Sequence, residues 1–194
     1  MTQENNFSPT YISKLRLSTP GSLPSRKTIL TILKKLHLSS NIINHQIAVM
    51  KKALDLAYNI TKTDVDIETV RVGALVHDIG RYKTHGMSHG VEGGILLRFL
   101  GFSESIARIA ETHSLTGLTA EEAVMFNLPA RNFCPQTIEE KLVCLADKYH
   151  MGTRKVTIEH RFEKWFLKYG ETPFLRTQLQ RAKDLEEEIL RLIF

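Results

Sequence analysis

The sequence predicts an all-α protein, a single bundle of about eight helices. Apolar residues recur at helical spacing in several long stretches, most clearly over residues 41–60 and 173–193. Residues suited to helix N-caps precede these stretches, and no run alternates convincingly between apolar and polar side chains, as a half-buried strand would. At 194 residues the chain fits one domain with a sizeable core.

The first three predicted helices are each introduced by a capping residue or a chain break. Ser25 is expected to cap a helix that reaches about residue 36, and a second helix is expected over 41–60. Asp66 should cap a third helix, which is very apolar and runs to Gly80. Because glycine commonly follows the last turn of a helix, we expect Gly80 to end this one.

Further helices are predicted to begin near residues 88, 103, 119, 137, 157 and 173. Two of them open with the capping-box pattern, Thr119 with Glu122 and Thr137 with Glu140. The last helix begins at Pro173, and proline is well suited to the first turn. The final two helices form a C-terminal helical pair over about residues 154–194. The last one is expected to serve as a packing helix or as the interface of a homodimer.

Charge divides the chain into a basic N-terminal extension, residues 1–24, and a domain over 25–194 that includes the C-terminal pair. The net charge is +5, and residues 1–40 alone carry six Lys/Arg and one Asp/Glu. The remaining residues carry 20 of each sign, so they balance (26 − 6 and 21 − 1). The domain therefore lacks a strong nucleic-acid signal. The extension is interpreted as a solvated, partly disordered tail, with packing through Phe7, Tyr11, Leu15 and Leu17 as the alternative.

The compartment is predicted to be the cytoplasm. No apolar run approaches the roughly 20 residues that span a bilayer, so no membrane association is expected. Residues 1–9 are polar and lack the apolar segment of a signal peptide. The only cysteines are Cys134 and Cys144, and nothing in their placement suggests a disulfide framework.

The stretch over residues 74–80 places His77 and Asp78 side by side in an apolar helix. Both side chains are common metal ligands, and a buried charge without a partner is costly. Adjacent helix residues point about 100° apart. His77 and Asp78 can therefore both bind metal only if the metal lies beside the end of the helix. This geometry suits Asp78 as a bridge between two metals. A His-Asp pair is common by chance and is weak evidence for a metal site by itself. The evidence is strengthened by further residues that can bind metal, namely His45, His89, His113 and Asp147.

The order of these residues resembles the HD superfamily of metal-dependent phosphohydrolases, with His77-Asp78-Ile79-Gly80 giving the HDIG form. The longer run through Thr84-His85-Gly86 and His89-Gly90 is similar to one family of short HDIG proteins. The resemblance implies an HD-type helical bundle and two divalent cations of iron, manganese or another transition metal. It also implies a catalytic role for Asp78 and six metal ligands: His45, His77, Asp78, His89, His113 and Asp147.

A phosphate substrate also needs cations near the metals. Arg81 follows the motif directly and is expected to act in catalysis and in substrate binding. Lys83 and Lys148 are candidates for substrate binding, with solvated surface charges as the alternative. His85 is expected to contact substrate or to support a ligand, and an exchange of roles with His89 stays open because four residues separate them.

The expected function is hydrolysis of a phosphoester or phosphoanhydride of a nucleotide-like small molecule by a metal-activated water. The chain has no Gly-Tyr-Pro signature and Ser114 follows His113, which argues against cyclic-di-GMP phosphodiesterases. The absence of a Glu-Asp dipeptide argues against the hydrolases of guanosine alarmones. Two alternatives remain: a mixed-valent di-iron oxygenase of the same superfamily, and a catalytically idle module that binds metal and nucleotide.

Overall fold

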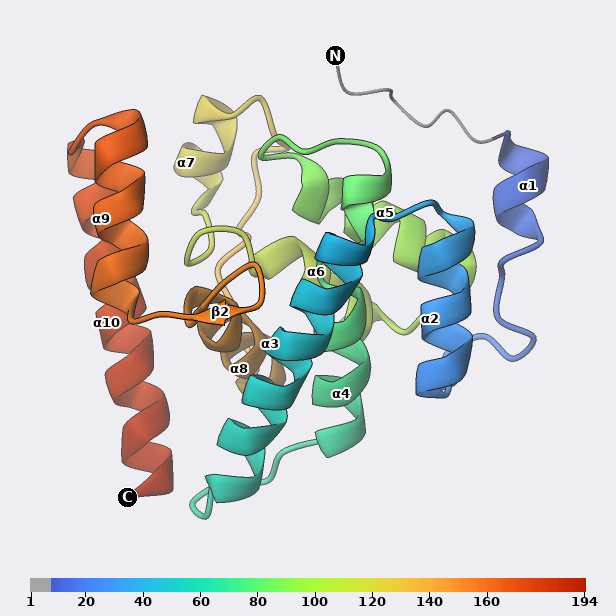
Figure 1. The fold of residues 1–194 in the computed structure, drawn as a ribbon, viewed down its shortest axis with the longest axis horizontal. Coiled ribbons are helices and arrows are strands. Elements are labelled where there is room, and N and C mark those ends of the chain that lie inside the picture. The colour runs from blue at the N-terminus through green and yellow to red at the C-terminus, as the bar shows by residue number, and fades with distance from the viewer. Residues whose placement is uncertain (1–7) are drawn as a thin grey trace.

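The computed structural model of the chain describes residues 8–194 (Figure 1). It confirms the all-α fold class, with ten α-helices in this part of the chain. None of these helices has both the length and the apolar character needed to cross a membrane. The helices are α1 (Pro9–Ser13), α2 (Arg26–Lys35), α3 (Ser40–Asn59), α4 (Ile67–Val76), α5 (His89–Leu100), α6 (Glu104–Thr112), α7 (Ala120–Met125), α8 (Ile138–Lys148), α9 (Ile158–Tyr169) and α10 (Pro173–Ile193).

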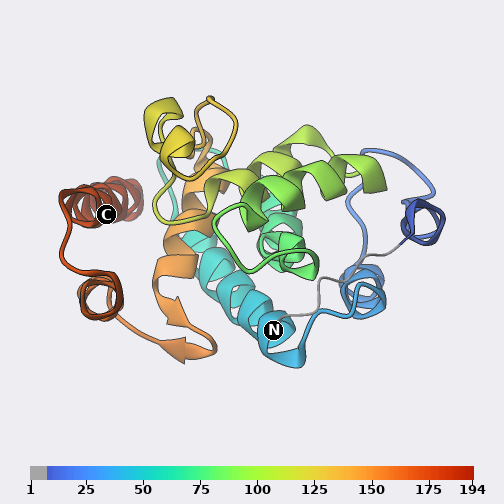
Figure 2. The same ribbon diagram turned by 90° about the horizontal axis from the view of Figure 1, so that it is seen from above.

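Five helices surround the main core: α3, α4, α5, α6 and α8. Each contributes a fully buried apolar side chain, namely Val49, Leu75, Leu97, Ile106 and Leu145. Helices α9 and α10 stand together on one side of this core, and α1 and α2 lie on the opposite side (Figures 1 and 2). The centre of the bundle is therefore flanked by two helical pairs, which the chain adds at its two ends.

The first predicted capping box forms completely, and the second forms only in part. Thr119 accepts a hydrogen bond from the backbone N–H of Glu122, whose carboxylate accepts one from the N–H of Thr119. Thr137 likewise accepts from the N–H of Glu140. The Glu140 carboxylate, however, accepts from the N–H of Gln136 at 2.9 Å, one residue earlier than the pattern predicts.

Gly80 does not end α4 as predicted. The helix ends at Val76, and the 3-10 turn η1 (Ile79–Tyr82) then carries Gly80 in its interior. Gly80 does not have the positive φ of a left-handed glycine cap. Instead, a Cβ atom there would overlap the carbonyl oxygen of His89 and lie 2.5 Å from the nitrogen of Gly93. Gly80 is therefore needed because the backbone of α5 passes directly against it.

A small antiparallel hairpin is another departure from the prediction, which contained no strand. Strands β1 (His150–Met151) and β2 (Arg154–Lys155) pair after the end of α8. Strands of two residues are too short to show an alternating pattern in the sequence. The hairpin turn contains Gly152, which has a φ of 60°.

The described part of the N-terminal extension is folded against the domain, as in the packed alternative and contrary to the solvated tail. Leu15 is only 6% exposed. The N–H of Leu17 donates to the carbonyl of Leu100 at 2.8 Å, and that of Gly21 to the carbonyl of Gly101 at 2.7 Å. The C-terminal end of α5 therefore holds this segment. Residues 1–7 lie outside the described part of the chain.

Replacing Gly80 by alanine should lower the free energy of unfolding by at least about 2 kcal/mol, because the new methyl group meets backbone that cannot move aside. Urea denaturation followed by circular dichroism, with metal-free protein, measures this change. Gly86→Ala is the matched control, since its nearest neighbour outside the chain-adjacent residues is Thr84 Oγ1 at 3.5 Å. Equal stability of the two variants would contradict the close-approach explanation.

Candidate metal centre and its cavity

The structure brings together all six residues predicted to bind metal. They come from α3, the end of α4, the start of α5, the end of α6, and α8: His45, His77, Asp78, His89, His113 and Asp147. Five of them line one cavity of about 610 Å³. The sixth, His77, is fully buried beside the others. Residues far apart in the sequence therefore meet where five helices converge.

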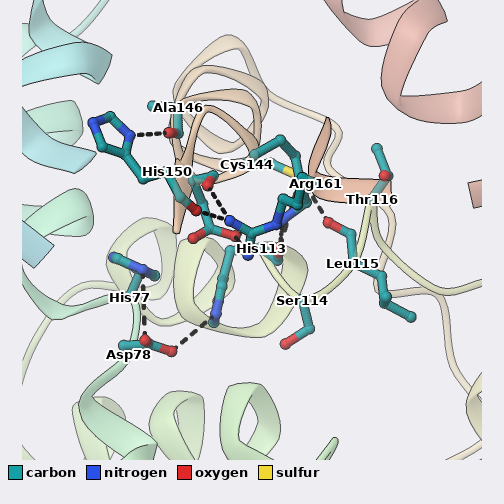
Figure 3. Close-up of polar contacts among 12 residues, drawn as sticks. His77, Asp78, His113, Ser114, Leu115, Thr116, Cys144, Ala146, His150 and Arg161 are labelled. Atoms are coloured by element: carbon teal, nitrogen blue, oxygen red, sulfur yellow. Dashed lines mark hydrogen bonds and ion pairs between the residues drawn. The ribbon is translucent and has the colours of Figure 1, made fainter. Parts of the chain in front are cut away.

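The carboxylate of Asp78 lies between two pairs of imidazole nitrogens. Its Oδ1 is 3.2 Å from Nε2 of His89 and 3.3 Å from Nε2 of His113. Its Oδ2 is 3.9 Å from Nε2 of His45 and 4.0 Å from Nε2 of His77. Figure 3 shows His77 and His113 directed toward Asp78. Two possible metal-binding groups thus share this one carboxylate, His45 with His77 on one side and His89 with His113 on the other.

Asp147 adjoins the first of these groups. Its Oδ1 lies 3.0 Å from Nε2 of His45. Its Oδ2 is held by Lys148 Nζ at 2.6 Å and by Arg161 Nη2 at 3.3 Å. Because the two cations engage Oδ2, Oδ1 remains directed toward His45 and the centre of the site.

All four imidazole rings are held in the same way, by a hydrogen bond from Nδ1 to a backbone carbonyl. The Nδ1–carbonyl distances lie between 2.7 and 2.9 Å, and the acceptors are Gly152 for His45, Ala74 for His77, Gly86 for His89 and Ala110 for His113. A carbonyl oxygen can only accept, so each Nδ1 carries a proton and each neutral ring keeps a lone pair on Nε2. Histidines that bind metal are commonly oriented in this manner.

Two buried polar atoms at the centre have no hydrogen-bond partner. They are Nε2 of His77 and Oδ1 of Asp78, which faces Arg81 Nε at 2.8 Å as an ion pair without hydrogen-bond geometry. Buried polar atoms in proteins are almost always hydrogen-bonded, so both require an explanation. A divalent cation beside each atom would satisfy it. Imidazole nitrogen together with carboxylate oxygen is also the donor set that transition metals accept. The residues present therefore fit a metal site.

The protonation states of His77, Asp78 and Asp147 agree with this interpretation, whereas at His45 burial is outweighed by the nearby carboxylates, which raise the pKa of that ring in the metal-free protein. Burial lowers the pKa of His77 to about 3, so the ring is neutral. Burial acts to raise the pKa of Asp78, but the nearby nitrogens of His113 and His89 outweigh it and hold the pKa well below the usual range. For Asp147 burial is likewise outweighed, here by the charge of Arg161, and its pKa is also well below the usual range. Neutral imidazoles and charged carboxylates are the forms that bind metal.

Two of the four residues predicted to bind substrate line the cavity, and two do not. Arg81 lines it and places Nε 2.8 Å from Oδ1 of Asp78. His85 also lines it. Lys83 is half-exposed and pairs with Glu92 at 2.8 Å, outside the cavity lining.

Lys148 is completely buried and also lies outside the cavity lining, contrary to the expected substrate contact. Its ammonium group donates to the Asp147 carboxylate and to the carbonyl of His113, at 2.6 and 2.8 Å. Both acceptors belong to predicted metal ligands or their backbone. Lys148 is therefore placed to orient Asp147 and the end of α6, and it cannot reach a molecule in the cavity.

Arg161 in α9 was not predicted as a site residue, yet it lines the cavity. Its Nη1 donates to the carbonyl of Asp147 at 2.8 Å and to the carbonyl of His150 (Figure 3). Its guanidinium also stacks on the ring of Trp165, 5.0 Å from the ring centroid. The sequence around it shows only an amphipathic helix with basic residues. Nothing local indicated that this arginine faces the site.

One wall of the cavity is aromatic and apolar. It is formed by Met87, Leu115, Phe126, Trp165, Tyr169, Phe174 and Leu175. The rings of Phe126 and Phe174 pack together at 5.4 Å between centroids. Most of this wall comes from the C-terminal pair, α9 and α10, and from the end of α7. The cavity therefore has a charged floor made of predicted metal ligands and an apolar wall contributed largely by other helices.

Comparison with known proteins places these observations in a family. The model of the HD domain family matches residues 42–152, a segment that contains all six predicted ligands. An uncharacterized protein of Methanocaldococcus jannaschii, MJ0778, is 42% identical over 166 residues, which cover 84% of this chain and 96% of the relative.

Two tRNA (cytidine(56)-2'-O)-methyltransferases are also similar. The Thermoplasma volcanium protein is 37% identical over 137 residues, which cover 71% of this chain and 40% of that protein. The Picrophilus torridus protein is 35% identical over 167 residues, which cover 86% of this chain and 47% of that protein. The chain thus spans less than half the length of either methyltransferase.

Among solved structures, the HD domain of the Listeria monocytogenes phosphodiesterase PgpH is similar in fold. Its structure aligns with a TM-score of 0.50 and 20% identity, covering 82% of this chain and 95% of that one. Its complex with cyclic-di-AMP aligns with a TM-score of 0.51 and 19% identity, covering 88% and 99%. At this identity the likeness shows the fold. The match of the family model over more than half of the chain confirms the resemblance drawn from the motif, and the chain belongs to the HD domain family.

Proposed function

We propose that the protein is a metal-dependent phosphohydrolase that acts on a phosphoester or phosphoanhydride of a nucleotide-like small molecule. The observation that carries this proposal is the pair of ligand groups sharing Asp78 on the floor of a cavity with cationic and aromatic walls. Two divalent cations held there would polarise a phosphate oxygen and activate a water molecule. Membership of the HD family supports divalent metal as the cofactor.

The ligand roles follow from the two groups. His45, His77 and Asp147 would hold one cation, and His89 and His113 the other, with Asp78 shared between them. Two carboxylates offset only two of the four positive charges on a divalent pair. The site therefore keeps an excess of positive charge, which favours an anionic substrate.

Cationic side chains of the protein extend this preference beyond the metal ligands. Arg81 lies beside the shared carboxylate, so its guanidinium adjoins a phosphate held on the cavity floor and offsets its charge. Arg161 and Lys168 line the wall contributed by α9. A substrate with more than one negative charge can thus contact cations on both sides of the cavity.

The aromatic wall supports a substrate with a planar apolar part, such as a nucleobase. Phe126, Trp165 and Phe174 offer ring faces or edges against which a base can pack. The cavity volume of about 610 Å³ is in the usual range for small-molecule sites. The solved complex of the PgpH HD domain with cyclic-di-AMP is in keeping with a nucleotide ligand.

The methyltransferases are more than twice as long as their matched segments, so their tRNA methylation is not carried over to this chain.

The main competing function is a di-iron oxygenase, which would use the same six ligands. A panel of phosphomonoesters, phosphodiesters and dinucleoside polyphosphates, assayed after metal analysis and with and without O₂, separates the two. We expect metal-dependent release of phosphate or nucleotide that does not change when O₂ is removed. Product formation that requires O₂, with an iron-specific spectrum, would replace the hydrolase by the oxygenase. Metal and nucleotide binding without any turnover would indicate an idle binding module.

Metal content tests the shared ligand. Saturated wild-type protein should contain two metal ions per chain by elemental analysis, and Asp78→Ala should lose both. His89→Ala or His113→Ala should lose mainly the second ion, because the other group keeps its ligands. His160→Ala is the matched control, since His160 lies on the outer part of α9 beside Glu163. A wild type that saturates at one ion, with His89→Ala and His113→Ala unchanged, would overturn the two-metal proposal.

The contribution of Arg81 is tested by Arg81→Ala. We expect kcat/KM to fall by about 10²-fold or more with metal content unchanged, because a positive group next to the reacting phosphate is removed. Lys83→Ala is the matched control, because this nearby cation pairs with Glu92 outside the cavity lining. It should stay within about three-fold of wild type. Equal effects of the two substitutions would contradict a specific role for Arg81.

The aromatic wall is tested by Phe126→Ala. It should raise KM about ten-fold for a nucleotide substrate, because a ring contact with the base is lost. It should leave KM for a base-free ester such as ribose 5-phosphate unchanged. Met125→Ala is the control, because Met125 is 66% exposed and does not line the cavity. Equal losses for both substrates would show that the ring does not recognise a base.

A further inference from the structure

A second groove lies on the opposite side of the bundle from the C-terminal pair, where the 14–24 segment meets α2 (Figures 1 and 2). Its volume is about 540 Å³. Its polar lining consists of four cations and four hydroxyl groups: Lys14, Arg16, Lys27, Lys35, Ser18, Ser22, Thr28 and Thr31. No carboxylate is among the lining residues. The groove shares no residue with the cavity that holds the metal ligands.

The four cations of the groove are not neutralised by neighbouring acids. All four are exposed, and none forms an ion pair with an acidic residue in the described range 8–194. Several arginines elsewhere are paired, as Arg71 is with Glu68 and Arg181 with Glu122. A concave surface lined by charge of one sign concentrates the field and attracts anions. Four of the six Lys/Arg of residues 1–40 therefore lie in one groove.

The walls of the groove are held rigidly. The N–H groups of Leu17 and Gly21 donate to carbonyls at the end of α5. The hydroxyl of Tyr11 donates to the carbonyl of Lys35 at 2.9 Å, which joins α1 to α2. Leu15 and Ile32, at 6% and 5% exposure, anchor the floor in the main core. A ligand would therefore meet a preformed surface and would not have to order a mobile tail.

The spacing of the cations favours an extended ligand. Lys27 and Lys35 are eight residues apart on α2, which is about 12 Å along a helix axis. Lys14 and Arg16 stand on the other wall of the groove. A single phosphate cannot contact both ends of such an array, whereas a strand with repeating phosphates can.

We propose that this groove binds the phosphate backbone of a nucleic-acid strand. Lysine, arginine and hydroxyl side chains are the groups that proteins direct at backbone phosphates. No aromatic side chain lines the groove, so it offers no ring on which a base can stack. Contacts to backbone phosphates are the same for every base sequence and are sensitive to salt. The groove is separate from the cavity that contains the predicted metal ligands.

Fluorescence anisotropy of the full chain with labelled single strands of RNA and DNA of about 12 nucleotides tests this proposal. Wild type should bind both strands, and log K should fall with log salt with a slope of about −2 to −3, as expected for up to four phosphate contacts. The double variant Lys27→Ala/Lys35→Ala should bind at least about ten-fold more weakly at low salt. Its slope should be shallower by about 1.4, because two contacts are lost.

The matched control is Lys51→Ala/Lys164→Ala, which removes the same charge from exposed positions outside the groove. It should bind within about two-fold of wild type, because neither lysine lines the groove and no contact to a phosphate held there is lost. Equal weakening of the two double variants would overturn the groove assignment, since net charge alone would then explain binding. Wild type that binds vesicles containing phosphatidylglycerol, or inorganic polyphosphate, but neither oligonucleotide would overturn the nucleic-acid ligand.

Discussion

The carboxylate of Asp78 carries a negative charge into the interior of the bundle, where it is only 3% exposed. Burying an ion costs on the order of several kcal/mol unless it is paired. Here four imidazoles and the guanidinium of Arg81 surround it. The helices that supply these groups must converge at one point, so the arrangement of α3, α4, α5 and α6 is tied to this charge. Gly80 permits the close approach of α5 that the arrangement needs.

The four imidazole rings around Asp78 are oriented by hydrogen bonds to backbone carbonyls, so the local backbone determines where each Nε2 points. Three histidines donate to a carbonyl three residues earlier in their own chain segment, while His45 donates to Gly152 in the hairpin after α8. Arg161 ties α9 to the same hairpin and to Asp147. The hairpin and the C-terminal pair thus support the ligands as well as enclose the cavity. Loss of either would release one side of the site.

The helices were predictable from sequence, because apolar residues recur at helical spacing. The convergence of the six predicted metal ligands was also predictable, because a histidine or carboxylate in an apolar helix needs a binding partner. His77 and Asp78 stood out within an apolar run for that reason. Lys148 was predicted to contact substrate, but it is buried and donates to Asp147 instead, because consecutive helix residues point about 100° apart. Phe126 and Trp165 could not be found, since no local pattern states which distant helix will face the site. The two-residue strands are too short to leave a signal.

The central claim is that Asp78 is shared between two metal ions. Anomalous difference maps from crystals of the protein saturated with manganese or iron, recorded at the absorption edge of the metal, test it most directly. We expect two peaks, one at ligand distance from Nε2 of His45 and His77, and one from Nε2 of His89 and His113, with a carboxylate oxygen of Asp78 at each. A single peak, or two peaks that Asp78 does not contact, would contradict it.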